Sequence, residues 1–235
     1  MTPAPSGAGG IPTQEMLPMR NTRLACLTLI LFLLLPANGF GQPQKGLLVY
    51  LGDRLTFDER NRGVYLGDQF RYQEFTVSAW IRPGANQPDW AAIVDNNHNS
   101  NQSFAIHQHG GSPNQYVFGI HSATSEAVGV SFTLQPGVWT HMILIKNRES
   151  LSAVQNGKVI DSKRIPIHYT ISYGPTPFLH LGRWGAGGRY WSGDLYHVRI
   201  YDRALNAREV SEIWKYEGRQ APPTDPEEAN GRDPN

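Results

Sequence analysis

A glycine-rich segment at residues 183–190, Arg-Trp-Gly-Ala-Gly-Gly-Arg-Tyr, brings together side chains that are well suited to bind a sugar. The rings of Trp184 and Tyr190 could stack on the apolar face of a pyranose, and Arg189 could bind its hydroxyls or carboxylates. The glycines do not predict a phosphate site, because no helix with free N–H groups follows them. Trp90, in another loop, is a second candidate platform. Each ring could instead fold back and cover the edge of a sheet.

The segment from residue 95 to residue 102, Asp-Asn-Asn-His-Asn-Ser-Asn-Gln, is the most polar part of the central region. Its candidate ligand-binding residues are Asp95, Asn97 and His98. Carboxylate and amide oxygens could bind calcium or accept hydrogen bonds from sugar hydroxyls. Asp and Asn side chains also build turns with their own backbone, so a surface loop without a ligand is the alternative interpretation.

Two histidines, His107 and His109, are two residues apart in a predicted strand and therefore share one of its faces. They could begin a transition-metal site, but third and fourth ligands would have to come from elsewhere. His98 and His121 are the nearest candidates in the sequence, and the pattern does not place either beside the pair. Because a solvated sheet face with two polar residues is the commoner explanation, we predict no metal site.

The elements that position these residues are short strands. Segment 75–82 alternates apolar and polar residues and stops at Pro83-Gly84, and the turn-rich stretch 110–114 predicts a hairpin. Asn156-Gly157 is a second hairpin turn, since both residues tolerate positive φ. With no long helical periodicity among the strands, the pattern predicts an all-β, antiparallel sandwich or barrel. The predicted strand segments are 75–82, 104–109, 116–121, 138–145, 151–155, 158–160, 178–181 and 195–201.

One short C-terminal helix is predicted after the strands. Asn206 can cap its first turn, Glu209 completes a capping-box pair, and Gly218 ends it. Leu205, Val210, Ile213 and Trp214 fall near one stripe, which predicts that the helix lies against the sandwich. Residues 218–235 contain four prolines, several charges and no large apolar residue, so we predict a disordered tail.

The N-terminal region predicts a secretory signal peptide. Arg20 and Arg23 precede the uncharged apolar run 24–35, and small residues up to Gly41 follow. The run is shorter than the ~20 residues that a membrane-spanning helix needs, so cleavage after Gly39 or Gly41 is expected and retention as an anchor is the alternative. The predicted leader and signal peptide cover residues 1–41, and no membrane span remains after cleavage.

Charge and cysteine content exclude several classes of protein. The net charge is +1, and removal of residues 1–41 would leave equal numbers of basic and acidic residues. Such a chain has no field for binding nucleic acid. The single cysteine, Cys26, lies in the predicted signal, so the exported part has no disulfide, no cysteine nucleophile and no zinc site built on cysteines.

The order and spacing of five motifs resemble the laminin G-like (LamG-like jelly roll) domains of the concanavalin A-like lectin/glucanase superfamily. The resemblance covers residues 46–217 and implies a jelly roll of two antiparallel sheets, often a non-catalytic module that binds glycans or proteins. The alternating carboxylates that glucanases of this superfamily place on one strand do not occur in the sequence. The matching segments are 75–83, 137–142, 156–158, 181–182 and 191–205.

The sequence departs from its relatives where they often carry acidic calcium ligands on the last long strand. Those positions are Tyr196 and His197 here, and the nearby acid, Asp194, is displaced toward the turn. Calcium is therefore disfavoured as a cofactor, because it prefers several oxygen ligands. Trp80, Trp139 and Trp191 are predicted to pack in the fold rather than to bind a ligand.

We therefore expect a secreted, periplasmic or cell-surface protein that is not an enzyme and binds glycan through its loops. A structural or adhesion protein with an extracellular protein partner is the alternative, and a glycoside hydrolase without the usual carboxylates is the third. The expected ligand-binding residues are Asp95, Asn97, His98, Trp184, Arg189 and Tyr190.

Overall fold

Strands account for more than half of the described residues between Leu47 and Tyr201. The structure, a computed structural model, describes residues 43–58, 60–96, 103–124, 126–175, 177–185, 187–218 and 222. The predicted signal segment, residues 1–41, and most of the predicted tail lie outside these residues.

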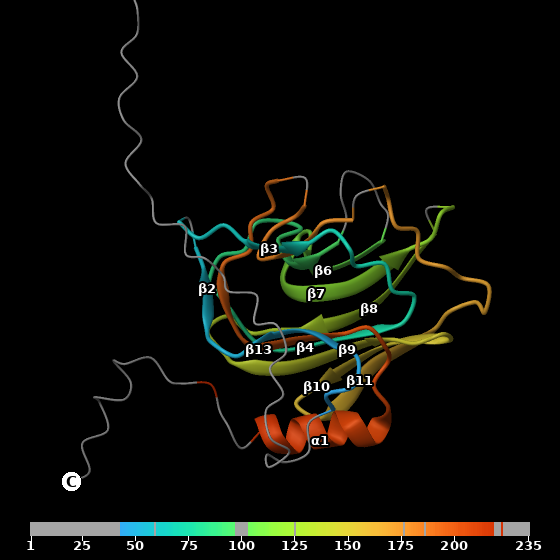
Figure 1. Ribbon diagram of the computed structural model, residues 1–235. Coiled ribbons are helices and arrows are strands. Elements are labelled where there is room, and N and C mark those ends of the chain that lie inside the picture. The colour runs from blue at the N-terminus through green and yellow to red at the C-terminus, as the bar shows by residue number, and fades with distance from the viewer. Residues whose placement is uncertain are drawn as a thin grey trace, which may run out of the picture. The chain divides into compact units, whose positions relative to one another are not determined.

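Two antiparallel sheets stack face to face (Figure 1). Alternation of side chains along each strand gives every sheet an inner face toward its partner and an outer face. The order in the first sheet, called sheet A, is β1 (Leu47–Leu51), β13 (Gly193–Tyr201), β4 (Phe75–Pro83), β9 (Thr140–Lys146), β10 (Ser150–Gln155) and β11 (Lys158–Arg164), with β2 (Leu55–Phe57) also paired to β13. The order in the second, sheet B, is β3 (Val64–Gly67), β12 (Leu179–Leu181), β5 (Ala92–Asp95), β6 (Ser103–His109), β7 (Ser112–His121) and β8 (Ala127–Thr133).

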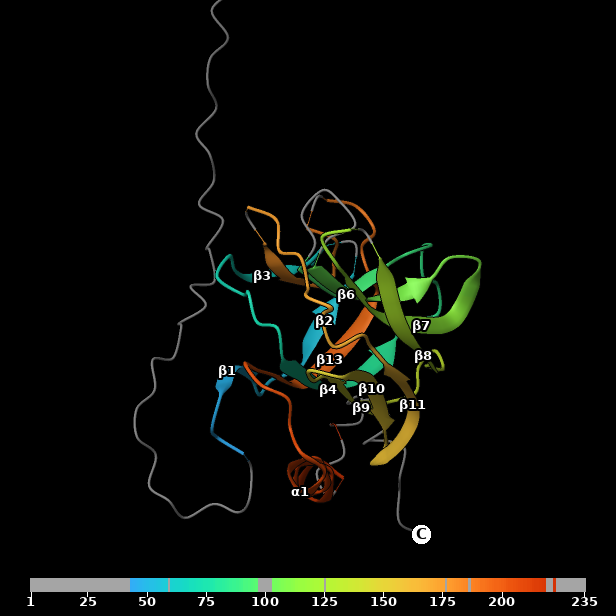
Figure 2. The ribbon, with the colours of Figure 1, turned by 90° about the vertical axis from the view of Figure 1, so that its right-hand side faces the viewer.

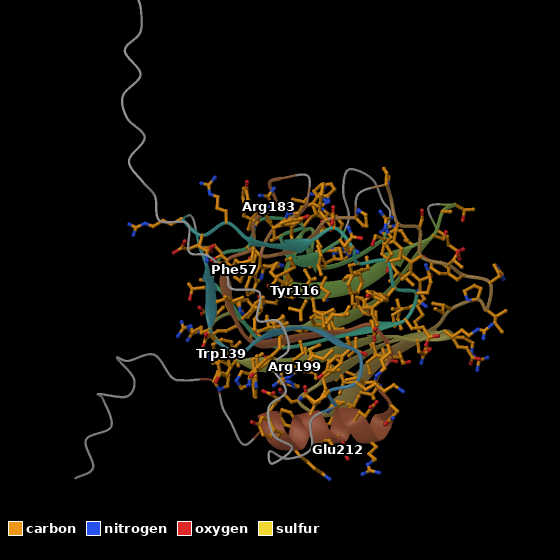
Figure 3. The ribbon with its side chains drawn as sticks, viewed as in Figure 1. Phe57, Tyr116, Trp139, Arg183, Arg199 and Glu212 are labelled. Atoms are coloured by element: carbon orange, nitrogen blue, oxygen red, sulfur yellow. The ribbon has the colours of Figure 1, made fainter. Side chains whose placement is uncertain are left out.

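The main core lies between the two sheets and is rich in aromatic rings. Phe75 of sheet A contacts Phe104 and Phe118 of sheet B, with ring centroids 4.4 and 5.8 Å apart. Trp191 is 1% exposed and packs on Phe57, which confirms its predicted core role. Figure 3 shows Phe57 and Tyr116 in this interior. The predicted all-β, two-sheet jelly-roll sandwich with one C-terminal helix is confirmed.

The two predicted hairpin turns are both present. Asn156 and Gly157 have φ values of 48° and 77°, and they join β10 to β11 as expected. The turn between β6 and β7 is shorter than predicted, because Ser112–Asn114 already belong to β7. Strands β1, β2, β3, β5 and β8 are additional to the segments predicted from the sequence.

The single helix among the described residues, α1 (Ala207–Glu217), lies against the outer face of sheet A, as Figure 2 shows nearly end-on. The Asn206 side chain accepts a hydrogen bond from the Glu209 N–H, and the Glu209 side chain accepts one from the Asn206 N–H. The predicted capping box is therefore confirmed. A second apolar cluster joins the helix to the sheet and comprises Ile143, Ile145, Val154, Tyr201, Leu205 and Ile213.

The outer face of sheet B is not covered by a helix in the part of the chain that the structure describes. Loops surround this face in Figure 1. Within the same residues, α1 is neither long nor apolar enough to cross a bilayer. The two sheets thus present very different outer faces, and the exposed one carries the candidate site.

Candidate functional site

A groove of about 460 Å³ lies on the outer face of sheet B, and we call it the sheet B groove. Its floor and walls come from strands β5 to β8, and its ends come from two loops. The lining residues are Trp90, Ala92, Asp95, Ala105, His107, His109, Val117, Gly119, His121, Ala127, Val128, Gly129, Trp184 and Arg189.

The floor of the sheet B groove is a row of very small residues that crosses the strands. Pairing places Asp95 opposite Ala105, Ala105 opposite Gly119, and Gly119 opposite Gly129. Three of these four positions therefore carry at most a methyl group. A Cβ atom at Gly119 would approach only a methyl of Val117, at 3.8 Å, so space rather than crowding surrounds this backbone. The row forms a channel whose direction is perpendicular to the strands.

Imidazole and aliphatic side chains form the walls on either side of this row. His107 and Val117 are paired on one side, and His121 lies on the other. Burial lowers the pKa of both His107 and His121, and positive charge nearby lowers it further, from Arg189 in the case of His107 and from His107 in the case of His121. Both rings are therefore neutral at pH 7, where a neutral imidazole offers one hydrogen-bond donor and one acceptor.

Trp90 stands beside the histidines at one end of the wall and is 41% exposed. Its ring centroid lies 5.5 Å from that of His107 and 5.6 Å from that of His109. A Cβ atom at Gly110 would lie 2.5 Å from the indole, so the absence of a side chain there makes room for the ring. Trp90 has φ of 64°, and its backbone N–H donates to Gln108 Oε1 at 2.9 Å. These contacts hold an open aromatic face at the groove.

The glycine-rich segment forms the opposite end of the groove. The Arg189 guanidinium carbon lies 3.6 Å from the centroid of the Trp184 ring, a close cation–π contact. The Gly185 N–H donates to Asp95 Oδ2 at 2.8 Å, and the Ala92 N–H donates to the Arg189 carbonyl at 3.0 Å. The loop is therefore fastened to β5 at two points.

The structure separates the predicted site residues into three groups. Trp184, Arg189 and Asp95 meet in the sheet B groove, as does Trp90. Tyr190 lies elsewhere, because it pairs with Ala92 and its ring contacts the guanidinium groups of Arg62 and Arg183. The direction of Tyr190 follows from the positive φ of Arg189, 47°, which turns the chain between the two residues. The other two candidates, Asn97 and His98, lie outside the described residues.

The floor residues Gly119 and Gly129 were missed by sequence reasoning. A search for functional side chains does not consider residues that have none. The sequence did carry a signal for them: strands β7 and β8 each have a glycine at an outward position of an alternating stretch. That the two glycines lie side by side follows only from the register of β6, β7 and β8.

A second group of polar residues lies between sheet A and α1, and we call it the helix-covered cluster: His141, His197, Arg199 and Glu217. Glu217 is 0% exposed, its Oε2 lies 2.7 Å from His197 Nδ1, and its Oε1 accepts from Arg199 Nη1. Burial alone would raise the pKa of Glu217, but these two partners bring it below its usual value. Burial lowers the pKa of His141 to about 4. Figure 3 shows Arg199 between sheet A and the helix.

The side chains at and near the positions where the resemblance implied calcium ligands already have other partners. His197 is bound to Glu217, and Asp194 accepts from Arg54 Nε at 2.9 Å, Thr56 Oγ1 at 2.6 Å and Arg82 Nε at 2.9 Å. Burial would raise the pKa of Asp194, but these hydrogen bonds lower it. Among the described residues, no group of three or more His, Cys, Asp and Glu side chains has the geometry of a metal site.

Comparison with known proteins defines the class to which this fold belongs. A laminin G family model of the concanavalin A-like lectin/glucanases superfamily matches residues 58–211, which is more than half of the chain. The chain therefore belongs to the laminin G-like family of this superfamily, as the resemblance implied.

Solved structures share the fold at low sequence identity. The binding domain of Paraclostridial Mosquitocidal Protein 1 is 21% identical with a TM-score of 0.56, and the match covers 73% of this chain and 46% of that one. The Botulinum Neurotoxin serotype G binding domain is 14% identical with a TM-score of 0.53, and the match covers 77% of this chain and 48% of that one. The matched region is thus less than half of either binding domain.

Proposed function

We propose that this protein is an exported, non-catalytic binding module that takes a neutral glycan in the sheet B groove. The observation that carries the proposal is the bare row Ala105–Gly119–Gly129, which leaves a channel between aromatic and imidazole walls. A flat sugar ring needs an aromatic face on one side and hydrogen-bonding groups at its rim. The groove supplies both from residues already held in place.

The charge of the groove supports a neutral ligand. Arg189 is the one fixed cation and Asp95 the one carboxylate among the described lining residues, and they act on each other electrostatically. The imidazoles of His107 and His121 are neutral at pH 7 because of their lowered pKa values. A ligand with a high charge would therefore gain little here.

The same residues support a binding role over a hydrolytic one. Glycoside hydrolysis ordinarily uses a pair of carboxyl groups on opposite sides of the scissile bond. The described lining contains Asp95 alone, it is 1% exposed, and one oxygen already accepts from Gly185. The structurally similar chains are themselves named as binding domains, which also supports binding.

A glycan panel tests the proposal with the full chain and two variants. Trp90→Ala removes the open ring face and is expected to weaken the glycan that binds best by about tenfold, the size typical of an aromatic residue central to an interface. Tyr65→Ala is the matched control, because Tyr65 is also an exposed aromatic on the outer face of sheet B, 53% exposed, but lies outside the groove. Binding by the wild type to no glycan on the panel would contradict the proposal and favour a protein partner.

Export forms a separate part of the proposal. The basic flank, apolar run and small-residue exit at residues 20–41 support cleavage near Gly39 or Gly41. Mass spectrometry of protein recovered from the secreted or periplasmic fraction should then show an N-terminus at residue 40 or 42. Recovery of a chain that still carries residues 20–35 would show instead that the segment is kept as an anchor.

A further inference from the structure

The two ends of the sheet B groove differ, and this difference bears on which part of a glycan can enter. At the β8 end, the floor finishes at Gly129 in the last strand of sheet B. No strand pairs with the far edge of β8 within sheet B, and β11 of sheet A lies beside it, where Asp161 accepts from the Ser131 N–H at 2.9 Å. Ala127 and Ser131, which flank Gly129 on the same face, are exposed, so a chain lying in the channel can continue past this end into solvent.

The Asp95 end is closed. Asp95 lies on the outward side of β5, yet it is only 1% exposed, because the 183–190 loop crosses over it. Gly185 donates to its carboxylate, and the stacked Trp184 and Arg189 side chains line the same end. These contacts form a wall across the direction of the channel.

Backbone hydrogen bonds hold the loop that forms this wall in place. The Gly187 N–H donates to the Trp184 carbonyl at 2.9 Å, which closes a tight turn within the loop. The Gly182 N–H donates to the Ile93 carbonyl at 2.9 Å, and the Trp191 N–H donates to the Gly182 carbonyl at 2.9 Å. Both bases of the loop are therefore attached to the sheet and to the core tryptophan.

Beyond the wall the same cross-strand row does not open again. Asp95 is paired with His180, and His180 with Tyr65. The rings of His180 and Tyr65 are in contact, with centroids 5.3 Å apart, and His180 is 8% exposed. Ring-bearing residues thus replace the glycines of the other half of the row, and no floor is left on which a sugar could lie.

We propose that the sheet B groove is a chain-end site, which takes the terminal rings of a linear neutral oligosaccharide with the last ring against Trp184. This inference rests on the proposed glycan-binding function. The open part of the row spans two strand spacings, from Ala105 to Gly129, or about 10 Å. That length accommodates about two pyranose rings, so rings further along the chain lie outside the protein.

The experiment uses cello-, laminari-, malto- and galacto-oligosaccharides of one to six units, with the full chain and calorimetric titration. For each series that binds, affinity should rise with length up to about two units and then change by less than twofold. Each oligosaccharide is also tested with a bulky amide-linked label on the reducing end and, separately, with a methylated non-reducing terminal ring. One of these two modifications should reduce affinity at least tenfold, and the other should leave it within twofold.

The outcomes separate this inference from the proposed function. If no series binds, the proposed function is contradicted for these neutral glycans. If a series binds but affinity continues to rise up to six units, or neither terminal modification weakens it, the glycan site stands and the chain-end inference is overturned. Binding to the corresponding polysaccharide gives a second measure: the number of protein molecules bound should follow the number of chain ends and not the total mass.

Discussion

The helix-covered cluster and the sheet B groove combine similar side chains, but the first is covered and the second is open. Both bring together histidines, tryptophans, an arginine and a carboxylate. In and around the helix-covered cluster these groups are His141, His197, Trp80 and Arg199 of sheet A and Trp214 and Glu217 of α1. In the sheet B groove they are His107, His109, His121, Trp90, Trp184, Arg189 and Asp95.

The difference lies in what covers each set. Below α1, the carboxylate of Glu217 binds both His197 and Arg199, so these three groups satisfy one another under the helix. On sheet B, the glycine row separates the walls and leaves a groove of about 460 Å³ between them. Residue type alone therefore does not distinguish a structural cluster from a binding site, whereas register and cover do.

The largest expected effect is a loss of stability caused by a substitution in the helix-covered cluster. Glu217→Ala leaves the Arg199 cation and His197 buried without their shared partner, so the free energy of unfolding should fall by about 3–5 kcal/mol. Urea unfolding at pH 7.5 measures it. Glu212→Ala is the matched control, because Glu212 lies on the same helix in an exposed pair with Arg208, and it should change stability little. A loss below 1 kcal/mol for Glu217→Ala would show that the cluster does not hold the helix.

The second largest expected effect is a loss of stability at acid pH, caused by His141 of the helix-covered cluster. The pKa of His141 is about 4 in the fold against 6.5 for an ordinary histidine, because burial disfavours its charged form, attraction to Glu217 offsets only part of this effect, and Arg199 and His197 add repulsion. Between these two values the unfolded chain binds more protons than the folded one, so stability falls as the pH falls through this window. From pH 7.5 to pH 5 the expected loss from His141 is about 2 kcal/mol.

The variant His141→Gln checks the origin of this pH dependence. Urea midpoints measured at pH 7.5 and at pH 5 should lie closer together in His141→Gln than in the wild type. His107→Gln is the comparison from the sheet B groove, where burial also lowers the pKa of the histidine. An equal pH dependence in the wild type and in His141→Gln would assign the effect to other groups.

A smaller effect is expected from a substitution at the helix cap, and it tests whether the two outer faces are independent of each other. Asn206→Ala removes the acceptor for the Glu209 N–H and should cost about 1 kcal/mol of stability. Since α1 contacts sheet A and not the sheet B groove, the glycan affinity of the folded protein should stay within twofold of the wild type. Thermal unfolding and a binding titration on the same sample measure both. A clear loss of affinity would mean that the two faces are coupled.

The sequence predicted local features well because their causes are local. Alternation over 75–82 became β4, and Asn156-Gly157 became a turn with both φ values positive. The capping box at Asn206 and Glu209 also depends on residues three apart. In each case the residue types themselves fix the nearby backbone.

The candidate site was predicted only in part because it depends on distant pairing. Trp184, Arg189 and Asp95 were named for their chemistry, and their meeting depends on how β12 and the loop after it pair with β5. The positive φ of Arg189 turns Tyr190 away from the groove, and the residue types do not predict this backbone conformation. The pairing of His197 with Glu217 likewise spans 20 residues and depends on where α1 docks.

The bare floor at Gly119 is the feature that makes the outer face of sheet B a candidate site, and a Cβ atom there has no close neighbour. A Cβ there meets only Val117, at 3.8 Å, and a β-branched residue suits a strand interior better than glycine. Gln115→Val is the matched control, because Gln115 is an exposed residue on the same face of β7 outside the groove.

The most direct test measures glycan affinity and unfolding free energy together for Gly119→Val and Gln115→Val. We predict that Gly119→Val unfolds with at least the wild-type free energy and binds glycan at least tenfold more weakly, while Gln115→Val binds as the wild type does. Wild-type affinity in a stably folded Gly119→Val protein would contradict the account, because the ligand would then not lie on the glycine row.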